Sequence, residues 1–233
     1  MTAMSDVTVL LLTFFMLTST FLQKEPVTVI TPSSVSEEKV HTSNVVTILV
    51  GTTDVNGNEE GKIFLGIAGD EDPEMGGTED VRMNALRKAA EDYKNYTGRD
   101  PGITQSDIEK FAKLNMVGVP LADLHSFLAL KPDQQDKYMS DLANPNVGIP
   151  LKEIVYTNAD GLRDITNEFR IWMRAINNAG NANLSQAIKS GEGIAVKADG
   201  TTNYETMHEV LDNLQTMKMN RFSVMTALKS EQD

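Results

Sequence analysis

Cysteine is absent from this chain of 233 residues, which excludes a disulfide framework, a thiol nucleophile and every thiolate metal site. Histidine is scarce, and the three present, His41, His125 and His208, lack the spacing of metal ligands. No nucleotide-binding glycine loop or nucleophile elbow occurs. The sequence therefore gives no support for an enzyme, a cofactor or a metal centre.

Basic residues are also in short supply, 21 against 33 acidic ones, and the formal net charge is −12. Nucleic acids require clustered Lys and Arg, so this balance argues against a nucleic-acid partner. Two acidic segments have side chains of the type that binds hard cations. Asp54, Asn56 and Asn58 resemble the start of a calcium loop, but Glu59 replaces the required Gly. The cluster at residues 70–74 (DEDPE) is more typical of a solvated loop.

Charge is missing altogether from Val7 to Gln23, and nothing later in the chain is as apolar. A helix over Met1–Leu22 would be about 33 Å long, enough to cross a hydrocarbon core of about 30 Å. We predict one transmembrane anchor helix at residues 1–23. A cleaved signal peptide and a buried helix are the alternatives; the first usually has basic residues before its apolar core, and none is present here.

Asp6 stands at the entrance of this apolar run. A carboxylate at the centre of a membrane-spanning helix raises the free energy of insertion by about 2.5–3.5 kcal/mol. Such residues commonly serve in proton relays. The alternative is that Asp6 lies among the lipid headgroups and only complements the helix dipole. Thr2, Thr13 and Thr20 share its helix face, since spacings of seven and fourteen residues turn by only about 20° and 40°. This polar face could support water or a partner's polar side chains.

Residues 2–16 (TAMSDVTVLLLTFFM) resemble the signature of the ExbD/TolR family, in which a T-P-x-x-D segment enters an apolar helix that ends in a Phe-Met-like pair. Ala3 stands where the family usually has Pro. Residues 27–33 (VTVITPS) are similar to the short extended segment that follows in the family. Lys and Arg are expected on the cytoplasmic side of a first helix, so we expect the natural translation start to lie upstream.

The resemblance implies that Asp6 is the proton-carrying residue of a non-enzymatic subunit of a motor driven by the proton motive force. It implies a homodimer of ExbD-like helices within a multi-spanning ExbB-like ring, and a TonB-like periplasmic partner. It also implies location in the inner membrane of a Gram-negative bacterium, with the C-terminal domain in the periplasm. The alternative function is a membrane-anchored periplasmic binding or scaffold module in which Asp6 is structural only. Whether the work serves uptake, envelope maintenance or motility stays open.

The remaining chain is predicted to be an α+β protein: an extended segment and linker at residues 24–44, then a periplasmic α/β domain at 45–233. Val45–Val50 and Lys62–Ile67 read as a hairpin around a turn-rich segment at 53–61. Residues 193–198 (GIAVKA), Tyr204–Met217 and Arg221–Leu228 read as a strand-helix-strand ending, which also resembles the family.

A helical insert is predicted at about residues 69–150, and the resemblance to the family covers the beginning and end of the chain better than this insert. Its helices are expected at Glu79–Tyr96, Gln105–Leu114, Leu121–Leu128 and Asp133–Leu142. A further helix is expected at Leu162–Asn178. There, Phe169, Trp172, Met173 and Ile176 share one face, which predicts a side packed against the core.

Overall fold

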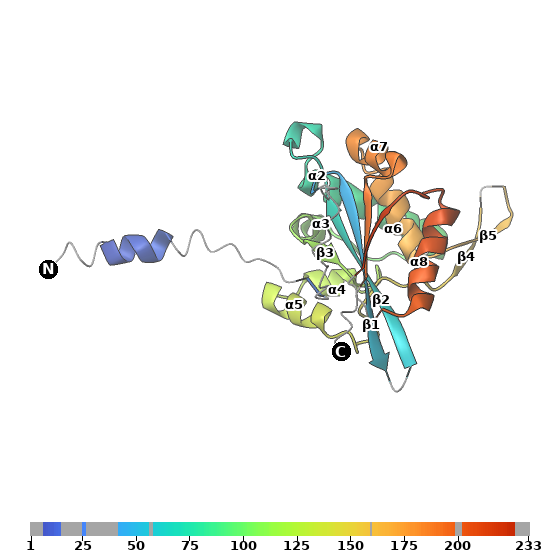
Figure 1. The fold of residues 1–233 in the computed structure, drawn as a ribbon, viewed down its shortest axis with the longest axis horizontal. Coiled ribbons are helices and arrows are strands. Elements are labelled where there is room, and N and C mark those ends of the chain that lie inside the picture. Colours follow the sequence, from blue (N-terminus) through green and yellow to red (C-terminus); the bar gives the residue numbers. More distant parts are fainter. Residues whose placement is uncertain are drawn as a thin grey trace, which may run out of the picture.

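The computed structural model describes residues 7–14, 25–26, 42–55, 58–158, 160–198 and 202–226. From residue 42 onward these residues form a five-stranded sheet with helices packed on it, which confirms the α+β class (Figure 1). The proposed boundaries at residues 23, 44 and 150 stay predictions. Residues 7–14 form a helix.

The sheet has the order β3-β2-β1-β6-β7. Its strands are β1 (Val45–Val55), β2 (Asn58–Ala68), β3 (Met116–Val117), β6 (Ile194–Ala198) and β7 (Ser223–Thr226). The β1–β2 hairpin, predicted from the sequence, is antiparallel, and β3 pairs antiparallel with β2. β6 lies parallel to β1, and β7 lies parallel to β6. The sheet is therefore mixed.

β1 is the central strand, and its composition explains this position. Val46, Ile48, Leu49 and Val50 are completely buried although they alternate between the two faces of the strand. A continuous β-branched and apolar run is typical of a strand covered on both sides. The strands that flank it, β2 and β6, satisfy its backbone on both edges.

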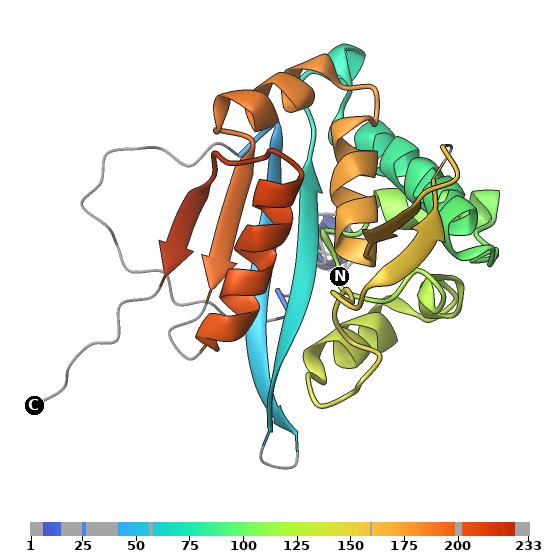
Figure 2. The ribbon, with the colours of Figure 1, turned by 90° about the vertical axis from the view of Figure 1, so that its right-hand side faces the viewer.

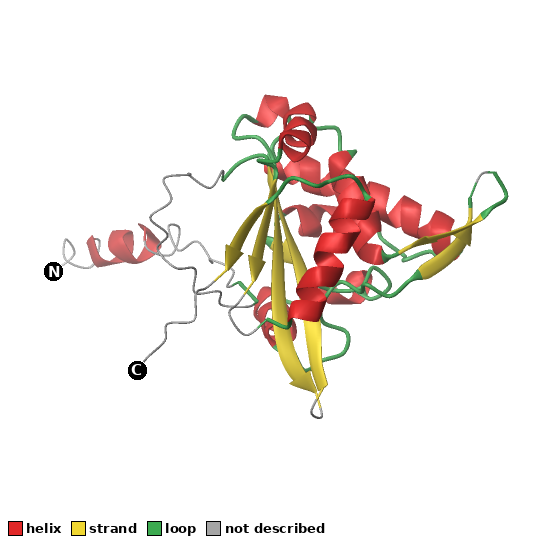
Figure 3. Ribbon diagram, turned by 45° about the vertical axis from the view of Figure 1, so that its right-hand side comes forward, coloured by secondary structure: helices red, strands yellow, loops and turns green. Residues whose placement is uncertain are grey.

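Three helices make the main helical packing. α2 (Thr78–Thr97) and α6 (Glu168–Asn177) pack against each other, and α8 (Tyr204–Thr216) lies over the sheet, running roughly along its strands (Figures 2 and 3). The predicted stripe on α6 is confirmed, since its four apolar side chains are buried. Trp172 stacks on Phe111 with ring centroids 5.5 Å apart. α6 thereby joins the sheet to the helices of the middle segment.

The middle segment contributes η1 (Pro73–Met75), α3 (Gln105–Ala112), α4 (Leu124–Leu128) and α5 (Pro132–Ser140). Helices occur at all four predicted places from residue 79 to 142, with ends shifted by a few residues. This segment also supplies β3 and buried side chains such as Phe111, Leu121 and Leu124. It is consequently part of the same core as the sheet.

Two predictions about element ends were wrong. The turn expected at 53–61 is much shorter, because backbone pairing continues from Thr53↔Glu60 to Val55↔Asn58 through polar residues. The helix expected from Leu162 begins only at Glu168; Arg163–Thr166 is instead β5, paired with β4 (Ile154–Thr157). Asn167 stops β5 and caps α6 by accepting from Arg170 N–H at 2.9 Å. The β4–β5 hairpin projects from the body of the domain (Figure 1).

The C-terminal strand-helix-strand order is as predicted, although β7 covers only Ser223–Thr226 of the expected Arg221–Leu228. Residues 227 and 228 lie outside the described part. α7 (Ala182–Ser190) precedes this ending and was not predicted. It begins at Asn181, whose side chain accepts from Leu184 N–H at 2.9 Å, and it ends at Gly191, where φ is 101°.

Candidate functional site

The predicted membrane site is described in part only. Asp6, Thr2 and Thr20 lie outside the described residues, so the proton-carrying position and most of the polar face stay predictions. Within residues 7–14, six apolar side chains are 50% to 66% exposed: Val7, Val9, Leu10, Leu11, Leu12 and Phe14. Such a helix needs lipid or a partner to cover it.

Thr13 is the one member of the polar face that the structure describes. Its hydroxyl donates to Val9 O at 2.9 Å and lies 3.0 Å from Leu10 O. A threonine in a helix commonly donates to a carbonyl of the preceding turn in this way, which satisfies the hydroxyl in an apolar environment. Among the described residues, none of the helices combines the length and the apolarity that a membrane crossing requires.

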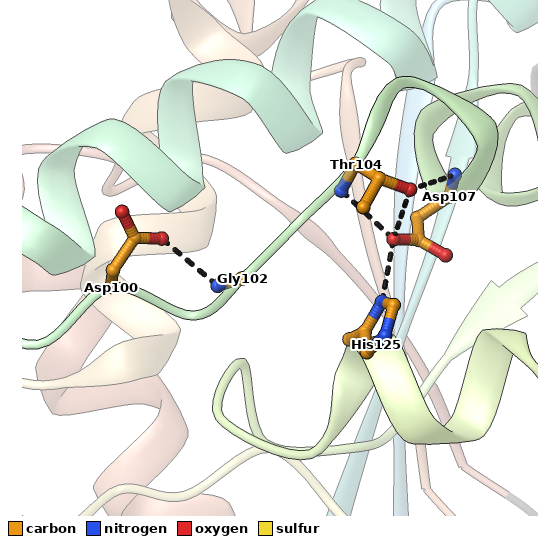
Figure 4. Close-up of polar contacts among 5 residues, drawn as sticks. All are labelled: Asp100, Gly102, Thr104, Asp107 and His125. Atoms are coloured by element: carbon orange, nitrogen blue, oxygen red, sulfur yellow. Dashed lines mark hydrogen bonds and ion pairs between the residues drawn. The ribbon is translucent and has the colours of Figure 1, made fainter.

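A second polar group lies in the domain, where α3 meets α4 (Figure 4). Asp107 Oδ2 accepts three hydrogen bonds: from Thr104 N–H at 2.8 Å, from Thr104 Oγ1 at 2.7 Å and from His125 Nδ1 at 2.7 Å. Thr104 Oγ1 accepts in return from Asp107 N–H at 3.3 Å, which completes a capping box at the start of α3. Asp107 is buried, whereas His125 is exposed.

The order of contacts in this group decides what it can do. Burial by itself would raise the pKa of the Asp107 carboxyl, but the hydrogen bonds from Thr104 and His125 outweigh it and hold that pKa below its ordinary value. A nucleophilic triad would require the histidine to bond the hydroxyl, with the carboxylate behind it. Here the carboxylate lies between His125 and Thr104. The arrangement therefore fixes two helix starts and does not activate a nucleophile.

The acidic loop at residues 70–74 is also structural. Asp70 Oδ2 accepts from Asn44 Nδ2 at 3.0 Å and from Asn183 Nδ2 at 2.7 Å, joining the residue before β1 to α7. These hydrogen bonds lower the pKa of the Asp70 carboxyl to about 2. Asp72 caps η1 by accepting from Glu74 N–H. In the described part of the chain, no three His, Asp or Glu side chains come together as a metal site would require.

Sequence reasoning missed a buried carboxylate, that of Glu168 in the first turn of α6. It is 7% exposed and accepts from Leu121 N–H at 2.9 Å. Burial raises the pKa of the Glu168 carboxyl to about 7, against the opposing effect of that hydrogen bond. Glu168 lines an open cleft of about 410 Å³ together with Tyr93 and Tyr96 of α2. The sequence signal was an acid directly after the capping Asn167, ahead of an apolar helix face.

The match to a family model decides the classification. The model described as ExbD, biopolymer transport protein ExbD/TolR, matches residues 1–140, which is more than half of the chain. The chain belongs to the ExbD/TolR family. No curated protein and no solved structure matches it.

The ExbD/TolR match corrects one expectation about coverage. It includes the middle helices up to residue 140 and stops before the strand-helix-strand ending that was compared with the family. ExbD/TolR proteins are non-enzymatic accessory subunits that take part in energy transduction for biopolymer transport. They generally work with ExbB and TonB-like partners and are typically anchored in the inner membrane with a periplasmic domain.

Proposed function

We propose that this chain is the proton-carrying subunit of an inner-membrane motor, with Asp6 as the residue that takes up and releases the proton. The observation that carries the proposal is the ExbD/TolR match, which begins at residue 1 and so includes Asp6 and the apolar run after it. The helix at 7–14 supports it, because an apolar helix directly follows the acid. The motor uses the energy of proton flow to do work on the outer membrane or envelope, and this work serves transport.

A single helix cannot enclose a proton path, because a carboxylate in hydrocarbon needs protein or water around it. The exposed apolar side chains of residues 7–14 offer the surface on which such protein would pack. We propose that a second copy of this chain and an ExbB-like multi-spanning subunit provide that surround. A TonB-like protein would then receive the work from the periplasmic domain.

The test is Asp6→Asn, which keeps the side-chain size and removes the ionisable group. Asp160→Asn is the matched control, because Asp160 is an exposed acid in the turn between β4 and β5. Activity dependent on the proton motive force should be lost in the Asp6 variant and kept in the control. Membrane insertion and association with the ExbB-like subunit should be unchanged in both. Full activity of Asp6→Asn would refute proton carriage by this residue.

A membrane-anchored binding module is the second candidate, because the cleft beside Glu168 offers a concave site in the domain. In that case Asp6 is structural, and Asp6→Asn keeps activity as long as the chain is inserted. The same pair of variants therefore separates the two functions.

A further inference from the structure

The cleft beside Glu168 is assembled from segments that are distant in sequence. The C-terminal end of α2 supplies Tyr93 and Tyr96, and the loop after it supplies Arg99. The segment before β4 supplies Lys152, and the first turn of α6 supplies Glu168. A volume of about 410 Å³ is sufficient for a small ligand.

The buried carboxylate is the most unusual feature of this cleft. Glu168 makes one hydrogen bond, from Leu121 N–H, and the described residues show no ion pair for it. Asp123, whose charge acts on the Glu168 carboxyl, has the same sign. A buried carboxylate with so few partners is costly, and a cation from outside would remove much of that cost. The Glu168 carboxylate can therefore still accept a hydrogen bond from a positively charged ligand group.

Buried polar groups on the same stretch of chain also lack partners. Thr166 Oγ1 and Trp172 Nε1 make no hydrogen bond although both are buried. Thr166 lies two residues before Glu168, and Trp172 lies one helical turn after it. Buried polar atoms are nearly always satisfied in native proteins, so two unsatisfied groups within four residues of Glu168 along the chain make this helix start unusual.

The walls of the cleft suit a cation as well. Tyr96 is held against Tyr156 of β4 with ring centroids 4.4 Å apart, which fixes one aromatic wall. Tyr93, which is buried, lines the same cleft as Glu168. The negative face of an aromatic ring attracts a desolvated ammonium group. Arg99 and Lys152 are exposed and place positive charge at the opening.

We propose that this cleft binds a small zwitterion of the α-amino acid class, with its ammonium group at Glu168 and its carboxylate at Arg99 and Lys152. A plain anion would meet the buried carboxylate, and a plain cation would offer no partner to Arg99 and Lys152, which line the cleft together with one exposed acid, Glu153. An α-amino acid complements both charges at once. This site does not depend on proton carriage by Asp6.

The pKa of Glu168 gives the binding a defined pH dependence. An ammonium group binds the ionised carboxylate, so binding should tighten as the pH rises through the pKa of about 7. Affinity should increase several-fold between pH 6 and pH 8. The other charged or titratable groups that face this region are Tyr93, Tyr96, Arg99, Asp123, Lys152 and Glu153. Of these, Tyr93 has a pKa raised above its ordinary value by burial, so it stays neutral in this range.

Binding can be tested on the full chain in detergent, with L-alanine and L-lysine as probes. n-Propylamine supplies the cation alone, and propionate supplies the anion alone. Trp172 is the only tryptophan and lies one turn from Glu168, so its fluorescence reports on the cleft, with calorimetry as a second measurement. We expect saturable binding of at least one amino acid, at least tenfold tighter than that of either single-charge probe.

Variants of single charged residues test the assignment. Glu168→Gln keeps an oxygen for Leu121 N–H and should weaken amino-acid binding at least tenfold, while Arg99→Gln, an exposed change, should weaken it several-fold. Glu192→Gln, an exposed acid after α7, should bind as the unchanged chain does. Absence of saturable binding by both amino acids would overturn the proposal, as would equally tight binding of n-propylamine. If both Arg99→Gln and Lys152→Gln bind the amino acid as tightly as the unchanged chain does, these two side chains do not bind its carboxylate. Asp6→Asn should retain binding, which separates this site from the proposed motor function.

Discussion

His125 Nδ1 lies 2.7 Å from Asp107 Oδ2, and this contact ties the first turn of α4 to the first turn of α3. The same oxygen caps α3 through Thr104, so one buried carboxylate organises two helix starts. A buried carboxylate that accepts three hydrogen bonds is well compensated, in contrast to Glu168. This difference sets opposite pH responses for the two acids.

Removal of the cap should be measurable on its own. Thr104→Ala deletes the hydroxyl that accepts from Asp107 N–H and donates to its carboxylate, so we expect the free energy of unfolding to fall by about 1 kcal/mol. Ser106→Ala is the control, because it deletes an exposed hydroxyl within the same helix. Urea denaturation in detergent, followed by Trp172 fluorescence, measures both. If the free energy of unfolding falls equally in the two variants, Thr104 does not act as the cap of α3.

Acid should weaken the Asp107 contacts. The pKa of this carboxyl is lower in the folded chain than its ordinary value, so the ionised form contributes stability above the unfolded pKa of about 4. That contribution is lost as the pH falls through the folded pKa. Asp107→Asn should therefore be less stable than the unchanged chain at pH 7, by about 1–3 kcal/mol, and the gap should narrow below pH 4. A gap that stays constant from pH 7 to pH 3 would argue against the ionic contribution.

The junction of α6 with α8 depends on Asn213. Its Oδ1 accepts from Asn167 Nδ2 at 2.8 Å and from Arg170 Nε at 2.6 Å, and its Nδ2 donates to Glu209 O at 2.7 Å. Asn213→Ala removes all three hydrogen bonds at a buried position, so stability should drop by about 2 kcal/mol. Gln215→Ala, an exposed change on the same helix, should stay within about 0.5 kcal/mol of the unchanged chain. Chemical denaturation of the two variants side by side provides the comparison.

The strands and helices with strong local patterns could be predicted from the sequence. The β-branched run of β1 and the apolar stripe of α6 each specify both the element and its buried side. β3 has only two residues, and β4 and β5 have four each, so they are too short for a periodic signal. Pairing with a distant partner decides such strands.

The two candidate sites differ in the same way. Asp6 could be found from the sequence because the motif and the apolar run lie next to it in the chain. The cleft could not be found, because Tyr93, Lys152 and Glu168 come together only when α2, the segment before β4 and α6 pack. In the sequence, Glu168 looks like an ordinary acid in the first turn of a helix. Its burial and its hydrogen bond from Leu121 N–H arise from tertiary packing.

Glu168→Gln should make the domain more stable at neutral pH. The pKa of Glu168 is about 7 in the folded chain against an ordinary value of 4.5, so the folded state binds the extra proton between these values. Stability contributed by this group is present below pH 4.5 and is lost as the pH rises to about 7, in total about 3 kcal/mol. Gln has no such loss and keeps an acceptor for Leu121 N–H. The variant should therefore match the unchanged chain near pH 4.5 and exceed it progressively up to pH 8, as measured by urea denaturation at each pH. In the control Glu192→Gln, the difference in stability from the unchanged chain should not vary with pH. If the stability of Glu168→Gln relative to the unchanged chain falls between pH 5 and pH 8, the folded state stabilises the carboxylate as an anion.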